Sequence, residues 1–454
     1  MADQAAVPSR DRSQFALFGS RRFAPFFFTQ FCGAFNDNLF KNALLLLAAF
    51  AGALRTDMDR DVLINLAAGL FVLPFFLFSA TAGQFADKYE KSRIIRVVKL
   101  AEIAIMGAGA VALYLGHMVG LLAVLFCMGT QSAVFGPVKY AIIPQYLRDE
   151  ELIGGNAQVE MGTFVAILGG TIGAGVLFTT QTPTLWIMVS VLVLAILGYA
   201  SSRFIPIALP TNPNLKVDWN PLRATWRNLR SARENRAVFY SILGISWFWF
   251  LGSLYLTQLP NFSSEILHGS ETVVTLMLTL FSVGIALGSP LCERMSGHKV
   301  ELGLVPFGSI GLSLFGIDLY FSVQISTAPT PLGILEFVRA EGNLRLLFDL
   351  FMLGLFGGFY IVPLYAIVQK RSEAAKRAQV ISANNILNAL FMVLAALVAM
   401  MLLGLAGLSI PQLFLVTALT NIAVAVFIYQ QIPEFSMRFF GVVVEPLHVS
   451  SDSP

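Results

Sequence analysis

The sequence predicts an all-α, polytopic membrane protein with twelve transmembrane helices in two six-helix bundles. Hydrophobic residues make up 56% of the 454 residues and charged residues only 13%, about half the roughly 25% found in soluble domains. The apolar residues form runs long enough to cross a bilayer, which takes about 20 residues per helix. Lys and Arg concentrate in alternate loops between these runs. This composition excludes a secreted disulfide scaffold, a disordered chain and a nucleic-acid binder.

Each apolar run is predicted to be a helix, because lipid cannot satisfy the open backbone groups of other structures. The first run follows Arg21 and Arg22, as in a signal peptide. It is too long for one and lacks a small-x-small cleavage site, so we expect it to be retained. The predicted spans are 23–52, 62–83, 94–115, 119–140, 154–178, 184–204, 237–260, 271–292, 301–322, 345–369, 379–405 and 410–431.

The basic residues predict the orientation of these spans. With the N-terminus in the cytoplasm, almost all of the 30 Lys and Arg residues fall in inside segments, Lys99 among them. The exceptions are Lys41 within a span and four arginines in outside loops, Arg55, Arg60, Arg339 and Arg345. The positive-inside rule therefore predicts that both termini are cytoplasmic.

The longest polar stretch, 205–236, divides the chain into two halves. It carries four prolines and then a basic segment from Arg223 to Arg236. We expect that segment to contact anionic lipid, with partner docking as the alternative. The predicted organisation is a cytoplasmic N-terminus (1–22), a first bundle (23–204), a cytoplasmic linker (205–236), a second bundle (237–431) and a cytoplasmic tail (432–454).

The two halves resemble each other weakly. Residues 138–143 match 363–368, and pairs of polar residues four apart recur in the fifth and eleventh spans. Parallel six-helix halves are typical of the major facilitator architecture, whose substrate site lies between the halves.

The stretch 83–93 resembles the loop signature of that superfamily, in which Gly83, Asp87, Lys88 and Arg93 fit and Glu90 and Ser92 depart. The resemblance implies a gate. Asp87 is expected to meet the start of the eleventh span around Arg377, where a helix N-terminus offers free N–H groups and partial positive charge. The alternative is a solvated turn.

Charged and amide side chains inside the first span are costly in lipid and usually mark a pathway. Asp37 lies near the middle of that span, and Lys41 follows one turn later on the same face. We interpret them as a receptor for a zwitterion, with Asn36 and Asn38 adding hydrogen bonds. A self-neutralising pair that locks two helices is the alternative.

Other spans add polar candidates. Glu160 shares a face of the fifth span with Asn156, and Lys139 lies at a similar depth at the end of the fourth. A charge pair that closes the inner side and a head-group exit station both fit this pattern, and Lys139 alone could snorkel. Four residues of the second half are predicted to face the same cavity: Tyr360, Asn384, Asn385 and Asn388.

Catalytic and metal-binding patterns are missing from the sequence. The cysteines Cys32, Cys127 and Cys292 lie in apolar runs and are expected to be buried thiols. The four histidines have no metal-site spacing. We therefore expect a protein that is not an enzyme and needs no cofactor or metal.

Several runs resemble the bacterial lysophospholipid transporter (LplT) family, over about residues 22–440. They are GAFNDNLFKN at 33–42, FGPVKY at 135–140, GGNAQVEMGT at 154–163 and ANNILN at 383–388. The runs at 291–301 and 357–365 are similar to the form fused to an acyltransferase and acyl-ACP synthetase. No acyltransferase motif follows residue 438, so the chain is either a stand-alone transporter or a fragment of the fused form.

The resemblance implies a transporter that moves lysophospholipid, usually lysophosphatidylethanolamine, from the outer to the inner leaflet of the bacterial inner membrane by alternating access. It implies contacts with membrane lipids and an acyltransferase/acyl-ACP synthetase, fused or associated, and we expect a monomer. A proton-coupled exporter of small amphipathic compounds and a non-transporting scaffold are the competing hypotheses.

Overall fold

The computed structural model describes residues 13–50, 60–297, 301–324, 330–439 and 441, and in this part of the chain twelve long helices follow one another in the predicted order. The first half contains α1 (Ala24–Phe50), α2 (Arg60–Lys88), α3 (Lys91–Tyr114), α4 (Met118–Tyr146), α5 (Leu152–Phe178) and α6 (Pro183–Ser202). The second half contains α8 (Arg236–Asn261), α9 (Glu271–Ser296), α10 (Leu304–Ser322), α12 (Asn343–Arg371), α13 (Arg377–Met400) and α14 (Ile410–Gln431).

Short elements connect or flank these helices. They are the 3-10 turns η1 (Gln14–Gly19), η2 (Asp149–Glu151) and η4 (Ala374–Lys376), the π-helical turns η3 (Phe262–Ile266) and η5 (Met401–Leu405), and the helices α7 (Pro221–Arg233), α11 (Ile334–Arg339) and α15 (Pro433–Phe439). The linker thus contains a helix of its own, α7, which the sequence reading did not predict. The Asn220 side chain accepts from the backbone N–H of Arg223 and caps its start.

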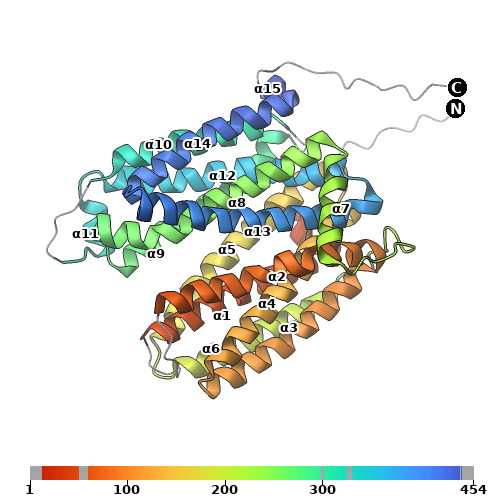
Figure 1. Ribbon diagram of the computed structural model, residues 1–454, viewed down its shortest axis with the longest axis horizontal. Helices are drawn as coiled ribbons and strands as arrows, with labels where there is room; N and C mark the ends of the chain where they lie inside the picture. Colours follow the sequence, from red (N-terminus) through yellow and green to blue (C-terminus); the bar gives the residue numbers. More distant parts are fainter. Residues whose placement is uncertain (1–12, 51–59, 298–300, 325–329, 440, 442–454) are drawn as a thin grey trace.

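Ten of the described long helices are apolar enough along their length to cross a membrane. The other two are α1 and α3. Both carry polar side chains: α1 has the run 36–42, and α3 has Lys99 and Glu102. Those side chains pack against neighbouring helices, so α1 and α3 belong to the same bundle as the rest (Figure 1).

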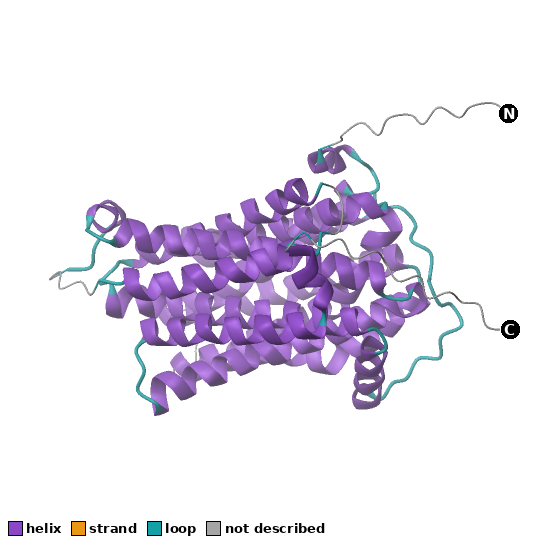
Figure 2. Cartoon of the chain, turned by 90° about the horizontal axis from the view of Figure 1, so that it is seen from above, coloured by secondary structure: helices purple, strands orange, loops and turns teal. Residues whose placement is uncertain are grey.

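The helices of the first half form one group and those of the second half another, with α7 crossing between them (Figure 1). Helices fill the length of the molecule, and loops lie at its two ends (Figure 2). We call the end with loops 89–90, 147–148, 203–220 and 372–373 the linker side, and the end with loops 115–117, 179–182 and 406–409 the far side.

Glycine permits the closest helix contacts within each half. A Cβ atom on Gly170 of α5 would lie 2.5 Å from the Phe35 carbonyl oxygen of α1, and one on Gly284 of α9 would lie 2.2 Å from the Phe351 oxygen of α12. Both distances are shorter than any real Cβ contact, so the backbones approach because no side chain is present. Gly170 and Gly284 therefore serve close helix packing.

Candidate functional site at the junction of the two halves

The two halves meet on the linker side. Between described residues, every hydrogen bond, ion pair and ring contact that joins the halves directly lies between the linker end and the middle of the helices. The deepest is the stacking of Phe164, midway along α5, on Trp249 of α8 at 6.1 Å between ring centroids. The structure is therefore closed on the linker side.

Asp87 forms the expected contact with the start of α13. Its carboxylate accepts hydrogen bonds from the backbone N–H of Ala378 (3.1 Å) and of Gln379 (3.2 Å), and from the Gln379 side chain (3.2 Å). Thr211 of the linker donates a fourth, at 3.1 Å. A carboxylate thus satisfies the free N–H groups at a helix N-terminus, and its charge opposes the helix dipole.

Of the other predicted gating residues, Gly83 and Arg377 lie near the Asp87 contact, whereas Lys88 and Arg93 do not take part in it. Gly83 lies at the contact, because a Cβ there would come within 2.7 Å of the Ser382 side chain and 2.8 Å of the Ala378 carbonyl oxygen. Arg377 donates to the Ser372 carbonyl rather than bonding Asp87. Lys88 lies over the ring of its neighbour Tyr89, and Arg93 is exposed. Among the described residues, neither Lys88 nor Arg93 forms a hydrogen bond or ion pair with the second half.

Asn156 is part of the closure. Its amide exchanges two hydrogen bonds with the amide of Gln369 on α12, at 2.7 and 2.9 Å, and is fully buried. This reciprocal pair leaves little of the Asn156 side chain for a substrate. In this state Asn156 holds the halves together through its amide pair with Gln369.

Glu160 lies one turn deeper, beside an aromatic pair that crosses between the halves. Tyr140 of α4 stacks on Tyr365 of α12 at 4.2 Å and donates a 2.6 Å hydrogen bond to Glu160. The second carboxylate oxygen of Glu160 is buried and has no hydrogen-bond partner. The Lys139–Glu160 charge pair, one of the two alternatives for these residues, is not formed in this state, and the Lys139 ammonium donates instead to Thr163 at 2.9 Å.

Asp37 and Lys41 lie in the middle of α1, and both side chains are half-buried. Asp37 accepts a 2.6 Å hydrogen bond from Ser132 of α4 through one oxygen. The Lys41 ammonium is 3.4 Å from the side-chain oxygen of Asn38 and lies over the Phe71 ring of α2. No contact ion pair joins Asp37 to Lys41 in this state, which disagrees with the alternative of a self-neutralising pair. The two side chains reach toward different helices, Asp37 toward α4 and Lys41 toward α2.

Asn36 points away from this pair. It is fully buried and donates a 3.0 Å hydrogen bond to Glu102 of α3. Glu102 in turn pairs with Lys99 at 2.6 Å, and both side chains are 1% exposed. A Cβ on Gly33 would lie 2.2 Å from the Lys99 ammonium, so that glycine makes room for it.

This second ionic cluster was missed because Lys99 was counted with the basic residues of an inside segment, although it lies within the predicted third span, 94–115. The spacing of Lys99 and Glu102, three residues apart in an apolar run, was the available signal.

Of the four predicted site residues of the second half, the three asparagines lie toward the junction and the tyrosine, Tyr360, does not. Asn385 lies against Gly136 of α4, whose added Cβ would come 2.2 Å from the amide nitrogen. Asn384 is buried beside Tyr365, and Asn388 accepts from Ser246 at 2.8 Å.

Tyr360 is 2% exposed and packs against Gly244 and Gly308 of its own half. Its expected position at the cavity is therefore wrong. Its place on α12 faces the interior of the second bundle.

The described residues contain no group of three or more His, Cys, Asp or Glu side chains that could hold a metal ion. The polar groups at the junction are instead amides, hydroxyls and single charges.

Sequence and structure comparisons both find similarity between this chain and membrane transporters. The chain is 27% identical to the lysophospholipid transporter LplT of Klebsiella pneumoniae subsp. pneumoniae over 353 residues, 76% of this chain and 79% of that protein. Among solved structures, the human organic anion transporter MFSD10 has a TM-score of 0.65 at 14% identity and covers 93% of this chain and 99% of its own. The transporter FucP in its outward conformation has a TM-score of 0.64 at 14% identity, covering 89% and 98%.

These solved structures establish the fold, and their identities are too low to show more. The profile of the Major Facilitator Superfamily matches residues 26–335, more than half of the chain. With its apolar helices, this makes the chain a multi-pass membrane protein, and its similar proteins are named as transporters rather than enzymes. The chain belongs to the Major Facilitator Superfamily.

Proposed function

We propose that this protein transports lysophospholipid from the outer to the inner leaflet of a bacterial inner membrane by alternating access. The halves 23–204 and 237–431 rock about the junction, and 205–236 joins them. Similarity to proteins named lysophospholipid transporters supports the substrate class. The linker side is the cytoplasmic side in this proposal, because the basic loops gather there.

One observation carries the proposal from the structure: Asp37 and Lys41 are two opposite charges, half-buried at the middle of α1, without a contact ion pair between them. Unpaired charges in a low-dielectric setting are costly. A zwitterionic head group compensates both, its ammonium on Asp37 and its phosphate on Lys41, with Asn38 beside them. The acyl chain lies along the apolar walls between the halves.

In this proposal Glu160, Lys139 and the amides Asn384, Asn385 and Asn388 form a second station nearer the linker side. The unpartnered oxygen of Glu160 is an acceptor for an ammonium group once the Tyr140–Tyr365 stack opens. Asn156 and Gln369 separate in the same movement. The head group thus passes from one acidic group to the next as the halves part on the cytoplasmic side.

The test is uptake of labelled lysophosphatidylethanolamine by vesicles that contain the purified protein. Asp37→Asn and Lys41→Ala should each reduce the initial rate at least about tenfold, since a lost charge contact worth about 1.4 kcal/mol changes a rate or equilibrium by that factor. Matched controls are Glu265→Gln and Lys216→Ala, which remove an exposed acid and an exposed base elsewhere. Normal uptake by both site variants would place the head-group site elsewhere.

A proton-coupled exporter of small amphipathic compounds is the second candidate, and the buried carboxyl of Glu160 favours it. An uncoupler separates the two functions, because an exporter stops when the proton gradient collapses and a passive flippase continues. A non-transporting scaffold is the third, and it predicts that Asp37→Asn changes nothing.

The proposal includes a monomer, since both halves of the path belong to one chain. It also includes an acyltransferase/acyl-ACP synthetase on the cytoplasmic side, fused or associated, which consumes the delivered lysophospholipid. Reacylation of transported lipid in membranes that contain both activities would test this link.

A further inference from the structure

The linker helix α7 has two different faces. Its inner face is formed by Ala224, Asn228 and Ala232, which are buried at four-residue spacing. The Asn228 amide donates to the Ala80 carbonyl of α2 at 3.2 Å and to the Ser382 hydroxyl of α13 at 2.8 Å. These helices belong to opposite halves, so α7 bridges the junction at the place where Asp87 closes it (Figure 1).

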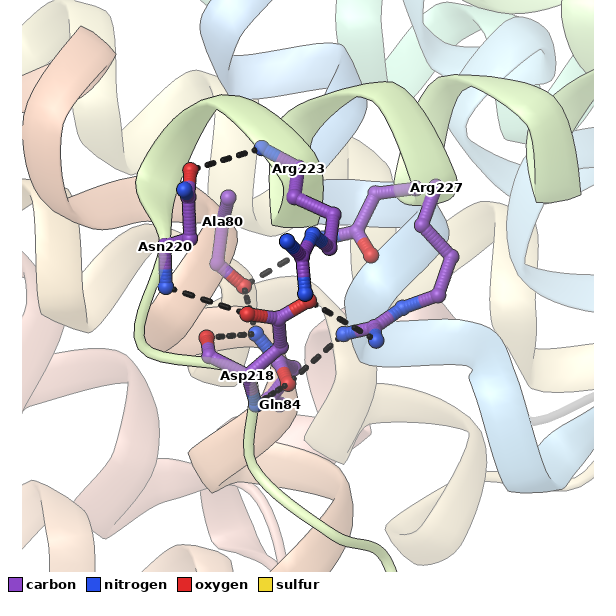
Figure 3. A network of polar contacts seen from close by, with 7 residues as sticks. Ala80, Gln84, Asp218, Asn220, Arg223 and Arg227 are labelled. Atoms are coloured by element: carbon purple, nitrogen blue, oxygen red, sulfur yellow. Dashed lines mark hydrogen bonds and ion pairs between the residues drawn. The ribbon is translucent and has the colours of Figure 1, made fainter.

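A polar network fixes the orientation of α7 (Figure 3). The side-chain oxygen of Gln84 on α2 accepts from the backbone N–H of Asp218 and from Arg227, both at 2.7 Å. Asp218 accepts from the backbone N–H of Asn220 at 3.1 Å. Hydrogen bonds hold both the start and the inner face of α7 against α2 and α13. Its opposite face, the outer face, therefore points away from the two bundles.

The outer face combines large apolar side chains with arginines. Trp219, Leu222 and Trp226 are 73%, 82% and 65% exposed. Arg230 and Arg233 are exposed beside them, and together with Trp226 and Leu229 they line a hollow of about 240 Å³. Exposed apolar patches with basic neighbours mark a surface that is covered in the working protein.

We propose that this face, which we call the α7 outer face, binds anionic phospholipid head groups of the leaflet on the linker side. The tryptophans and Leu222 enter the boundary between head groups and acyl chains, and Arg230 and Arg233 hold phosphate groups. This composition is that of an amphipathic helix lying in a membrane interface. The position agrees, because α7 packs on the ends of membrane-spanning helices.

Bound anionic lipid would stabilise the packing of α7 on α2 and α13. It would therefore favour the state that is closed on the linker side. Lipid composition then regulates how often the halves part there. The inference is independent of the cargo, since no residue of the α7 outer face belongs to the substrate site.

The experiment uses the full chain with its three native cysteines replaced and an environment-sensitive fluorophore on Leu222→Cys. The protein is placed in vesicles of phosphatidylcholine alone or mixed with phosphatidylglycerol, with no lysophospholipid present. We expect a blue shift of the emission that grows with the phosphatidylglycerol fraction and decreases as salt is added.

Arg230→Gln with Arg233→Gln should reduce that lipid-dependent shift several-fold. The matched control is Arg203→Gln with Lys216→Gln, which removes the same charge from exposed positions of the loop 203–220 that precedes α7 and should leave the shift intact. An equal shift in both vesicle types, or equal behaviour of the two double variants, would overturn the proposal. An equal shift produced by soluble polyglutamate without anionic vesicles would assign the face to an acidic protein partner instead.

Discussion

At the scale of single residues, the first bundle holds two kinds of charge. Asp37 and Lys41 are half-buried and lack a contact ion pair, whereas Lys99 and Glu102 are 1% exposed and paired at 2.6 Å. A closed pair between α1, α3 and α6 suits a fixed structural role. Open charges suit a group that binds and releases a ligand. Burial and pairing, rather than residue type, separate these roles.

Glu102→Gln should destabilise the protein strongly, because it leaves the Lys99 charge buried and unpaired. Breaking such a pair costs about 3–5 kcal/mol, whereas replacing both partners with apolar residues is often near neutral. Thermal unfolding of the purified protein should therefore show a large fall in Tm for Glu102→Gln and a smaller one for Lys99→Met combined with Glu102→Leu. Asp37→Asn is the comparison and should change Tm little. Equal falls for the single and double variants would mean that the pair has no such role.

The half-buried charges of α1 could be predicted from the sequence, but the partners of several other polar side chains could not. Asp37 was found because a carboxylate in the middle of an apolar run is visible without a structure. Asn156 was placed in the binding site because helical spacing gives the face of a side chain and not its partner, here Gln369. Lys99 was missed because it lies near the end of a span, where basic residues usually mark a loop.

At the scale of helices, the contact of α2 with the start of α13 could be predicted from the resemblance of residues 83–93 to the superfamily loop signature. The free N–H groups of a helix N-terminus give the contact its physical reason. The boundaries of α7 could not be predicted, although four of its residues are arginine. Its helix depends on the Asn220 cap and on burial of Asn228 between α2 and α13, and both depend on the assembled bundles.

Asp87→Asn should loosen the linker side. A carboxylate at a helix N-terminus is worth about 0.3–1 kcal/mol, rising to about 2 when partly buried, and about 1.4 kcal/mol shifts two states tenfold. A cysteine at Gly154, which lies beside Gln14 and Glu293 where α5 meets α9, should label several-fold faster in this variant. Asp149→Asn is the control, since its ion pair with Lys370 is exposed and weak. Unchanged labelling would leave Asp87 with a turn-stabilising role only.

Gly83→Ala should have the same effect for a steric reason. The added Cβ would lie 2.8 Å from the Ala378 carbonyl oxygen, and backbone cannot move without displacing α13. The same cysteine probe should therefore label faster, and transport should slow. Gly69→Ala, on the same helix with nothing within 4 Å of its added Cβ, should behave as the parent protein. If both alanine variants label alike, the α2–α13 approach does not control the opening.

At the scale of the whole molecule, composition and charge were sufficient to predict twelve helices in two groups, because the bilayer restricts what an apolar chain can form. The sequence could not show which conformation the halves adopt. That depends on contacts between distant residues, such as Tyr140 with Tyr365 and Phe164 with Trp249, whose aromatic side chains resemble dozens of others in the sequence.

These aromatic contacts lead to a prediction about cargo size. The Tyr140–Tyr365 and Phe164–Trp249 stacks close the junction from the linker side to the middle of the helices. A substrate whose head group reaches Asp37 must place its tail between the halves beyond that level, where packed bundles accommodate one chain more readily than two.

Phosphatidylethanolamine with two acyl chains should therefore be carried at least about tenfold more slowly than the one-chain lipid with the same head group, a difference of about 1.4 kcal/mol. Parallel uptake assays with both lipids in the same vesicles would measure the ratio. Trp249→Ala removes one ring of the deeper stack and leaves space for a second acyl chain, so the ratio of one-chain to two-chain uptake should decrease. Trp186→Ala, at an exposed position of α6, should leave that ratio unchanged. Equal rates for the two lipids in the unaltered protein would exclude a path between the halves and favour a groove on the lipid-facing surface.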